Sequence, residues 1–219
     1  MKPNYDLAAT KAMEVLVDNK ICSAPIAPLP IIKKQNGVLV LSFAEMSDRI
    51  GIDRSNLVEM FGLHNQDAVT TANINNGEIR YAVAYNQKLP LAIVQRALAR
   101  ELGHIVLGHD GSRPEEVRNA EAICFANHFL APRPLIKMVQ DSGLPVTVEL
   151  FGNMTGCYEH CLGCIKNLPG ANVPEELNRQ IREQFADYAN NFLNFQKILS
   201  MKDKSRLVDF GTYMDNYKE

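Results

Sequence analysis

The sequence predicts an α+β fold in which helices predominate around a small antiparallel sheet, with an added C-terminal helix. Helical spacing of apolar residues recurs along the chain, from residues 5–18 to residues 174–200. Residues 67–85 instead hold two β-rich runs, and the Asn-Asn-Gly sequence at 75–77 supplies the positive φ that a tight hairpin turn requires. A chain of 219 residues is also long enough to form one domain with a real core.

The elements before the hairpin are predicted from spacing and capping residues. Residues 5–18 place apolar side chains at helical spacing, whereas the proline-rich segment 21–32 is expected to be extended or turning. Ser42 is the expected N-cap of a helix over 42–50, with Glu45 three residues later as its capping-box partner. Another short helix is expected near residues 54–61.

Helices predominate after the hairpin. The apolar segment after Pro90 is expected to form one helix that carries Glu101 and His104, and Gly103 inside it indicates that another element packs close to that position. Pro114 suits the first turn of the next helix, where a missing backbone N–H does no harm. The remaining expected helices span residues 114–130, 134–142, 155–167 and 174–200.

The last helix carries an apolar stripe with coiled-coil spacing. Its members step by 4, 4, 3, 4, 3 and 4 residues and are Leu177, Ile181, Phe185, Tyr188, Phe192, Phe195 and Leu199. Such a stripe usually packs on its own domain, and a homodimer through residues 177–199 is the alternative. We therefore divide the protein into a domain over residues 1–170 and a C-terminal helix and tail over 171–219.

Charge and composition exclude several classes of function. The formal net charge is −2 with mixed acids and bases, which argues against direct nucleic-acid binding. No apolar run is long enough to cross a membrane, and the N-terminus lacks the apolar stretch of a signal peptide. An odd number of cysteines, five, fits reduced thiols, so we expect a cytoplasmic protein.

The most informative stretch is Arg100-Glu101-Leu102-Gly103-His104. With histidine at position 100 it would read H-E-x-x-H, in which two histidines one turn apart hold Zn²⁺ and the glutamate deprotonates the metal-bound water. Arg100 has no lone pair and stays charged, so it cannot ligate a metal. Glu121 lies in the next helix, and an antiparallel helix hairpin would bring it to the first helix as a glutamate ligand.

The run YNQKLPLAIVQRALARELGHIVLGH, followed by EAICFANHFLAP, resembles the ImmA/IrrE family of zinc metallo-endopeptidases over roughly residues 5–168. The resemblance implies a zincin-like metallopeptidase domain over residues 1–170 that requires zinc. It implies that His104 and Glu121 are metal ligands and that Glu101 is the general base. Arg100 falls on the first ligand and does not match. The implied partner is a helix-turn-helix repressor of a prophage or mobile element.

The arginine at position 100 separates two functions. Catalytic zinc generally needs three protein ligands, and a neighbouring cation repels it, so we expect zinc to be weak or absent. Arg100 would instead pair with Glu121 or Glu101 and cross-link the two helices in place of the metal. The protein is then either an endopeptidase that acts on the repressor, with weakened or abolished catalysis, or a non-catalytic pseudo-peptidase that works by protein–protein binding.

A second group of possible ligands follows residue 156. Cys157, Cys161 and Cys164 step by four and three residues, so they share one face of a helix. We interpret them as small core side chains, because free cysteine is among the most buried residue types. A metal cluster completed by His160 is the alternative.

The remaining histidines carry less specific signals. Cys124 or His128 would serve as a replacement ligand only in a rebuilt site. His109 would need the helix to end at Gly108 to approach His104, and we interpret it as a capping or loop residue. His64 lies in a polar stretch and is expected to be exposed.

Overall fold

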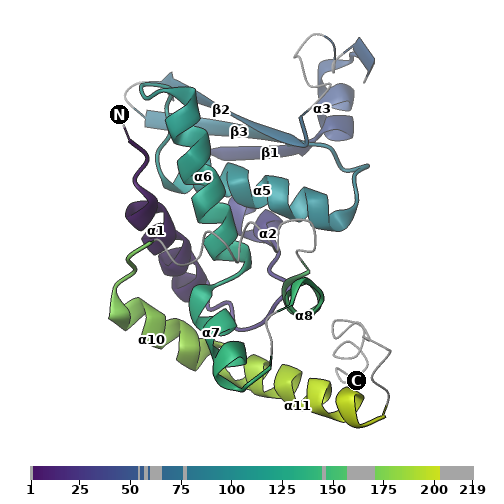
Figure 1. Cartoon of the computed structure of the whole chain (residues 1–219). Coiled ribbons are helices and arrows are strands. Elements are labelled where there is room, and N and C mark those ends of the chain that lie inside the picture. The colour runs from purple at the N-terminus through teal and green to yellow at the C-terminus, as the bar shows by residue number, and fades with distance from the viewer. Residues whose placement is uncertain are drawn as a thin grey trace. The chain divides into compact units, whose positions relative to one another are not determined.

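The computed structural model of the protein is an α+β structure in which helices predominate, as the sequence predicts (Figure 1). It describes residues 2–53, 55–56, 59, 66–75, 78–144, 147–156 and 171–202. The protein groups into two compact units, one of Met1–Asn4 with Ala27–Ala126 and one of Tyr5–Ile26 with Asn127–Glu219. The boundary proposed between residues 170 and 171 stays a prediction. In the described part of the sequence, no helix is long and apolar enough to cross a membrane.

The sheet of the first unit has the strand order β1–β3–β2. Strands β2 (Ala68–Asn75) and β3 (Glu78–Tyr85) form the predicted antiparallel hairpin, with Ala68 opposite Tyr85. The turn residues 76–77 lie outside the described residues. Strand β1 (Val38–Ser42) runs parallel to β3, so the sheet is mixed and the prediction of an antiparallel sheet is wrong for this strand. The short run VLVLS lacks polar alternation, although the turn dipeptide Asn36-Gly37 directly precedes it.

Helices pack on both faces of the sheet. Helix α5 (Leu91–Val106) packs against β2 and β3 on one face, and α2 (Pro28–Lys33) packs against α5 (Figure 1). On the other face, α3 (Phe43–Ile50) buries Phe43 against Val69 and Ala84. This helix lies only at one end of the sheet, and Leu39 on that face is 46% exposed (Figure 1). The expectation that residues 21–32 would be extended or turning is wrong for α2, because Pro28 and Pro30 occupy its first turn, where no backbone donor is needed.

The start of α3 is formed by the predicted capping box. The Ser42 hydroxyl accepts the Glu45 backbone N–H at 3.2 Å, and the Glu45 carboxylate accepts the Ser42 backbone N–H at 2.6 Å. The helix ends at Gly51, whose φ of 72° is left-handed. The predicted helix near 54–61 falls largely on residues outside the described ones.

Helix α6 (Glu115–Leu130) crosses α5 at Gly103 instead of forming the expected antiparallel hairpin with it (Figure 1). A Cβ atom placed on Gly103 would lie 3.1 Å from the Ala122 carbonyl oxygen and 3.1 Å from the Phe125 Cβ. The sequence therefore indicated correctly that another element packs close to this glycine. The close approach is what brings the start of α6 to the Glu101–His104 segment.

We expect Gly103→Ala to lower the free energy of unfolding. Alanine gains about 1 kcal/mol of helix propensity, whereas overpacking of a tight contact costs about 1–3 kcal/mol. One of the three atoms at 3.1 Å is a backbone oxygen, which moves less readily than a side chain, so the net loss should be about 1 kcal/mol. Urea unfolding measures it, and Phe125→Leu in the same background should recover part of it. A stability gain in Gly103→Ala would contradict the close packing.

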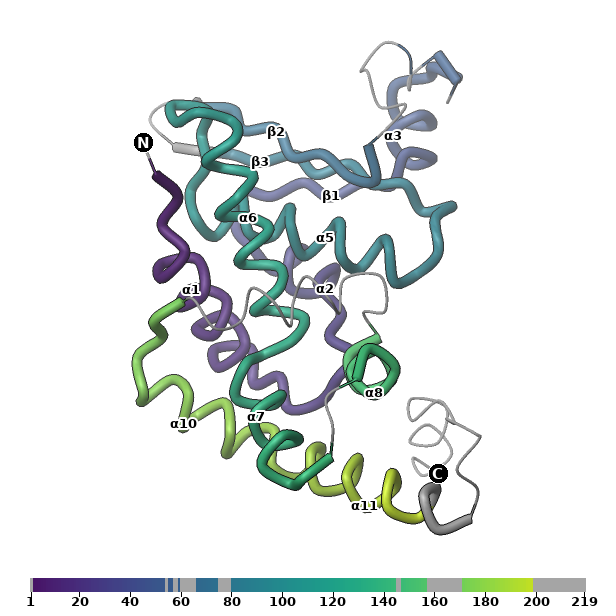
Figure 2. The backbone as a smooth tube through the Cα atoms, viewed as in Figure 1, coloured from purple at the N-terminus to yellow at the C-terminus, as the bar shows by residue number. Residues whose placement is uncertain are grey.

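The second unit is helical. Helix α1 (Tyr5–Asp18) packs against α10 (Glu175–Gln184), and α10 packs against α7 (Arg133–Asp141). Helix α8 (Val148–Thr155) ends at Gly156. The predicted long C-terminal helix is two helices in succession, α10 and α11 (Ala186–Lys202), with a break at Phe185 (Figure 2).

The apolar stripe of the C-terminal helices belongs to the core of this unit. Its buried members are Ile181, Phe185, Tyr188, Phe192 and Phe195. The Tyr188 hydroxyl also donates a hydrogen bond to the Met154 carbonyl at 2.5 Å. Since this face is used within the protein, the reason for expecting a homodimer through residues 177–199 is removed.

Candidate functional site

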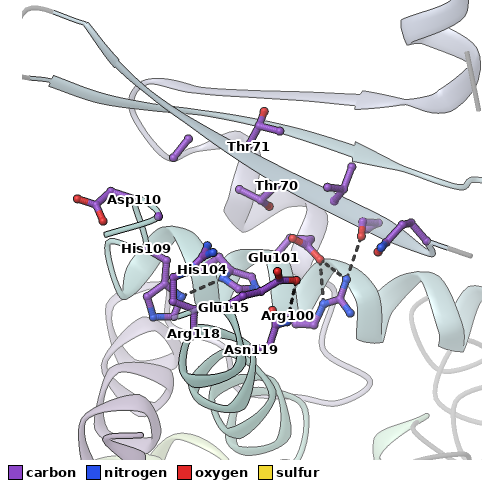
Figure 3. A pocket seen from close by; sticks show the side chains of 15 residues that line it. Thr70, Thr71, Arg100, Glu101, His104, His109, Asp110, Glu115, Arg118 and Asn119 are labelled. Carbon is purple, nitrogen blue, oxygen red and sulfur yellow. Dashed lines mark hydrogen bonds and ion pairs between the residues drawn. The ribbon is translucent and has the colours of Figure 1, made fainter. Parts of the chain in front are cut away.

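A cleft of about 470 Å³ opens beside strand β2 in the first unit (Figure 3). Strand β2 forms one wall, and the second half of α5 with the loop and first turns of α6 form the others. Glu101 and His104 line it from α5 and are 2% and 9% exposed. Glu121, on α6, is 1% exposed and is not among the lining residues. It reaches His104 only through an intermediate residue.

That residue is His109, in the loop after α5. Its Nδ1 lies 2.9 Å from Nδ1 of His104, and its Nε2 lies 3.1 Å from Oε2 of Glu121. His109 is buried, and its placement in a loop agrees with the sequence interpretation. Its role in joining His104 to Glu121 was missed. The signal that could have found it was Gly108, whose φ of 66° turns the backbone sharply after α5 ends at Val106.

Hydrogen bonding assigns a proton to each imidazole. Burial raises the pKa of Glu121, but hydrogen bonds from Arg113, Asn4 and His109 hold it below its ordinary value, so the carboxylate is charged. His109 must then donate its Nε2–H to Glu121 and accept at Nδ1 from the Nδ1–H of His104. His104 consequently keeps a lone pair on Nε2, which has no hydrogen-bond partner among the described residues.

Both imidazoles are neutral at pH 7. Burial, together with the charges of His109, Arg100 and Arg118, lowers the pKa of His104 to about 3. Burial also lowers the pKa of His109, although Glu121 acts in the opposite direction. The series Glu121–His109–His104 therefore ends in an uncharged nitrogen acceptor at the cleft.

Arg113 occupies both oxygens of the expected third ligand. Its Nη1 lies 2.7 Å from Oε2 of Glu121 and its Nη2 lies 2.7 Å from Oε1. The backbone N–H of Asn4 donates to Oε1 as well, at 2.6 Å. With His109, this buried carboxylate accepts four hydrogen bonds from three residues, two of them in the loop between α5 and α6. Sequence reasoning did not identify Arg113.

Arg100 lies at the edge of the cleft and pairs with its neighbour in the sequence. Its Nε and Nη2 lie 2.9 and 2.7 Å from Oε1 of Glu101, and Nη2 also donates to the Ala68 carbonyl oxygen at 2.9 Å. The expected pairing with a glutamate is therefore present. The expected cross-link between the two helices is wrong, because the guanidinium ties α5 to strand β2 and Glu121 is held by Arg113.

These contacts do not fit a zinc ion with three protein ligands. Arg100 cannot ligate, and both oxygens of Glu121 already accept from a guanidinium. Of the three expected metal ligands, only His104 has an atom, Nε2, whose lone pair is available to a metal. Throughout the described ranges, no group of three or more His, Cys, Asp or Glu side chains is placed to hold a metal ion.

The other predicted candidates do not contribute to the cleft. Cys124 does not line it, and His128 belongs to the second unit. His128 is buried, and its Nδ1 has no hydrogen-bond partner in the described structure. His64 and the possible ligand group Cys157, His160, Cys161 and Cys164 lie outside the described residues.

His128 gives a prediction for the pH dependence of stability. Burial and the charge of Arg133 lower its pKa from 6.5 to about 4. Below pH 6.5 the unfolded state binds a proton there that the native state does not bind until about pH 4, so stability falls as the pH falls through this window. His128→Asn should remove a slope of about 1.4 kcal/mol per pH unit. Urea unfolding between pH 5 and about 7 compares the two proteins, and equal slopes would contradict the assignment.

No family model, no curated protein and no solved structure matches this sequence. The ImmA/IrrE resemblance therefore stays a prediction that rests on the residues quoted above.

Proposed function

We propose that the protein is a pseudo-peptidase of the ImmA/IrrE type, which keeps a zincin-like peptidase cleft and binds a helix-turn-helix repressor without zinc-dependent cleavage. The resemblance supplies the repressor as partner, and the cysteine usage supplies the cytoplasm as the expected compartment. The geometry of the cleft supplies the reason for assigning binding in place of catalysis.

The pairing of both glutamates with arginines carries this proposal. Arg113 binds both oxygens of Glu121, and Arg100 binds Glu101 through two hydrogen bonds to one oxygen. Forked guanidinium–carboxylate pairs are among the stronger polar contacts in proteins. A zinc ion would have to displace Arg113 from Glu121, and it would still lack the first ligand at position 100. The two arginines supply the positive charge beside these glutamates that zinc would otherwise supply.

A zinc endopeptidase is the second candidate, and one observation favours it. Glu101 and His104 lie at the same cleft, Glu121 is linked to them through His109, and His104 Nε2 is open. This grouping is what a peptidase would need after a local rearrangement. The two functions are distinguished by cleavage of the repressor: an endopeptidase would need zinc and Glu101 for it, whereas a binding protein would need neither to bind.

The test uses a helix-turn-helix repressor encoded beside the gene. Binding is measured by isothermal titration with and without EDTA, and the repressor is then analysed by mass spectrometry. We expect equal affinity in both buffers and an intact repressor, with Glu101→Gln binding as the wild type does. Cleavage that is lost with EDTA and in Glu101→Gln would establish the endopeptidase instead. If the repressor is neither bound nor cleaved, it is not the partner of this protein.

A further inference from the structure

Arg118 differs from Arg100, which also lines the cleft, and from Arg113, which binds Glu121 behind it. Arg100 and Arg113 are each committed to a glutamate. Arg118 lines the cleft, and its Nε donates to the Arg113 carbonyl oxygen at 3.0 Å, which fixes the plane of the guanidinium. Its terminal nitrogens have no carboxylate partner among the residues that the structure describes. Arg118 is thus a positioned, half-buried cation with an open hydrogen-bonding edge.

The acids around Arg118 have other partners. Asp110 accepts the backbone N–H of Ser112 at 2.9 Å, and Glu115 faces the Asn119 amide at 3.5 Å. Figure 3 shows Arg118, Glu115 and Asn119 on the same side of the cleft. Asp110 and Glu115 are both close to Arg118, and neither pairs with it. The edge of Arg118 is therefore open although acids are available nearby.

The position of Arg118 is also unfavourable for a cation. It lies in the first turns of α6, near the positive end of the helix dipole, where Glu115 and Glu116 are placed as expected. A structural role would favour an acidic or neutral side chain here. Among the described residues, the one hydrogen bond of Arg118 goes from Nε to the Arg113 carbonyl oxygen, and residues that break a local rule are expected at functional sites.

We propose that Arg118 binds a carboxylate group of the segment that occupies the cleft, an inference that rests on the proposed protein-binding function. A guanidinium edge matches the two oxygens of a carboxylate or a phosphate. The charged side chains lining the cleft are Arg100, Arg118, Glu101, Asp110 and Glu115, an excess of negative charge. This excess repels a phosphate dianion more than a singly charged carboxylate, so the carboxylate is selected.

Two carboxylate sources are distinguished by two small probes. N-acetylglycine represents the C-terminus of a polypeptide, and N-acetylaspartate amide represents an acidic side chain. Each is titrated into the ¹⁵N-labelled full-length protein while the arginine Nε–H resonances are followed by NMR. We expect a saturable shift of the Arg118 resonance with one or both probes, and weaker binding of inorganic phosphate. The tighter probe identifies the source.

Variants make the assignment specific. Arg118→Gln should weaken binding by about tenfold or more, and Arg118→Lys should weaken it less, because lysine keeps the charge and loses the fork. Glu115→Gln should strengthen binding by removing a negative charge one turn away from Arg118, which repels the incoming carboxylate. Arg49→Gln is the matched control, since Arg49 lines a separate apolar groove formed with α3, and binding should not change.

The proposal is overturned if the shift does not saturate, if Arg118→Gln binds as the wild type does, or if phosphate binds more tightly than both carboxylates. Far-ultraviolet circular dichroism of each variant shows whether it is folded. If Arg118→Gln is unfolded, the other two variants test the proposal. Arg118→Lys should then lower the affinity for the carboxylate probe and Glu115→Gln should raise it, and any other result overturns the proposal. The titration uses no repressor, so its failure is separate from a failure of the pseudo-peptidase proposal.

Discussion

Glu121→Gln should lower the free energy of unfolding by about 3 kcal/mol, because it neutralises one member of a buried ion pair. The carboxylate is buried, and it accepts from Arg113 at 2.7 Å through both oxygens, from Asn4 at 2.6 Å and from His109 at 3.1 Å. A neutral amide cannot accept at its nitrogen, so at least one of these donors loses its partner. The Arg113 side chain is 30% exposed and can turn partly to solvent, which limits the loss.

Urea unfolding of Glu121→Gln, Arg113→Gln and the double variant forms the measurement. The double variant should lose less than the sum of the single losses, because the first substitution already breaks the pair. The exposed pair Lys137–Asp141 is the matched control, with side chains 61% and 64% exposed. Asp141→Asn should change stability by less than about 1 kcal/mol. A loss below about 1 kcal/mol for Glu121→Gln would contradict its role as a buried structural acceptor.

Arg100→His alone should not restore a tight zinc site, although it completes the H-E-x-x-H motif. The new histidine would add one donor to His104, but Arg113 would still hold both oxygens of Glu121. Arg100→His combined with Arg113→Gln removes the guanidinium from Glu121, which keeps its hydrogen bonds from Asn4 and His109 and must exchange the one from His109 for the metal. With the introduced histidine and His104, Glu121 would then complete the three ligands that catalytic zinc needs. We expect the double variant to retain about one zinc per protein molecule after dialysis and the single variant to retain much less.

Inductively coupled plasma mass spectrometry measures the zinc retained. Adding His104→Ala to the double variant should remove the metal, which assigns it to this cleft. About one tightly held zinc in Arg100→His alone would show that Arg113 releases Glu121 readily. Arg100 alone would then prevent zinc binding, and Arg113 would not contribute to its exclusion.

Features governed by local rules were predictable from the sequence. The capping box of Ser42 and Glu45 depends on residues three apart, and the β2–β3 hairpin depends on two β-rich runs and a turn. Gly103 indicated a close contact because a glycine inside an apolar helix is otherwise unfavourable. The α+β class followed from these elements.

Features that depend on tertiary placement were not predictable. Whether Arg100 pairs with Glu101 or Glu121 depends on where α6 crosses α5, and spacing along the sequence does not specify a crossing. Arg113 lies in a loop, and only the path of that loop brings its guanidinium to Glu121. His109 was placed in a loop correctly, but its link to His104 requires the backbone reversal at Gly108.

If this cleft functions without zinc, the purified full-length protein should contain little of the metal, and its metal content is the most direct test. The wild type and His104→Ala are purified without chelator, dialysed, and analysed by inductively coupled plasma mass spectrometry. Zinc far below one per protein molecule in both is the predicted result. About one zinc per molecule in the wild type, lost in His104→Ala, would contradict this expectation. It would establish that the cleft binds zinc through His104 and a protein ligand other than residue 100.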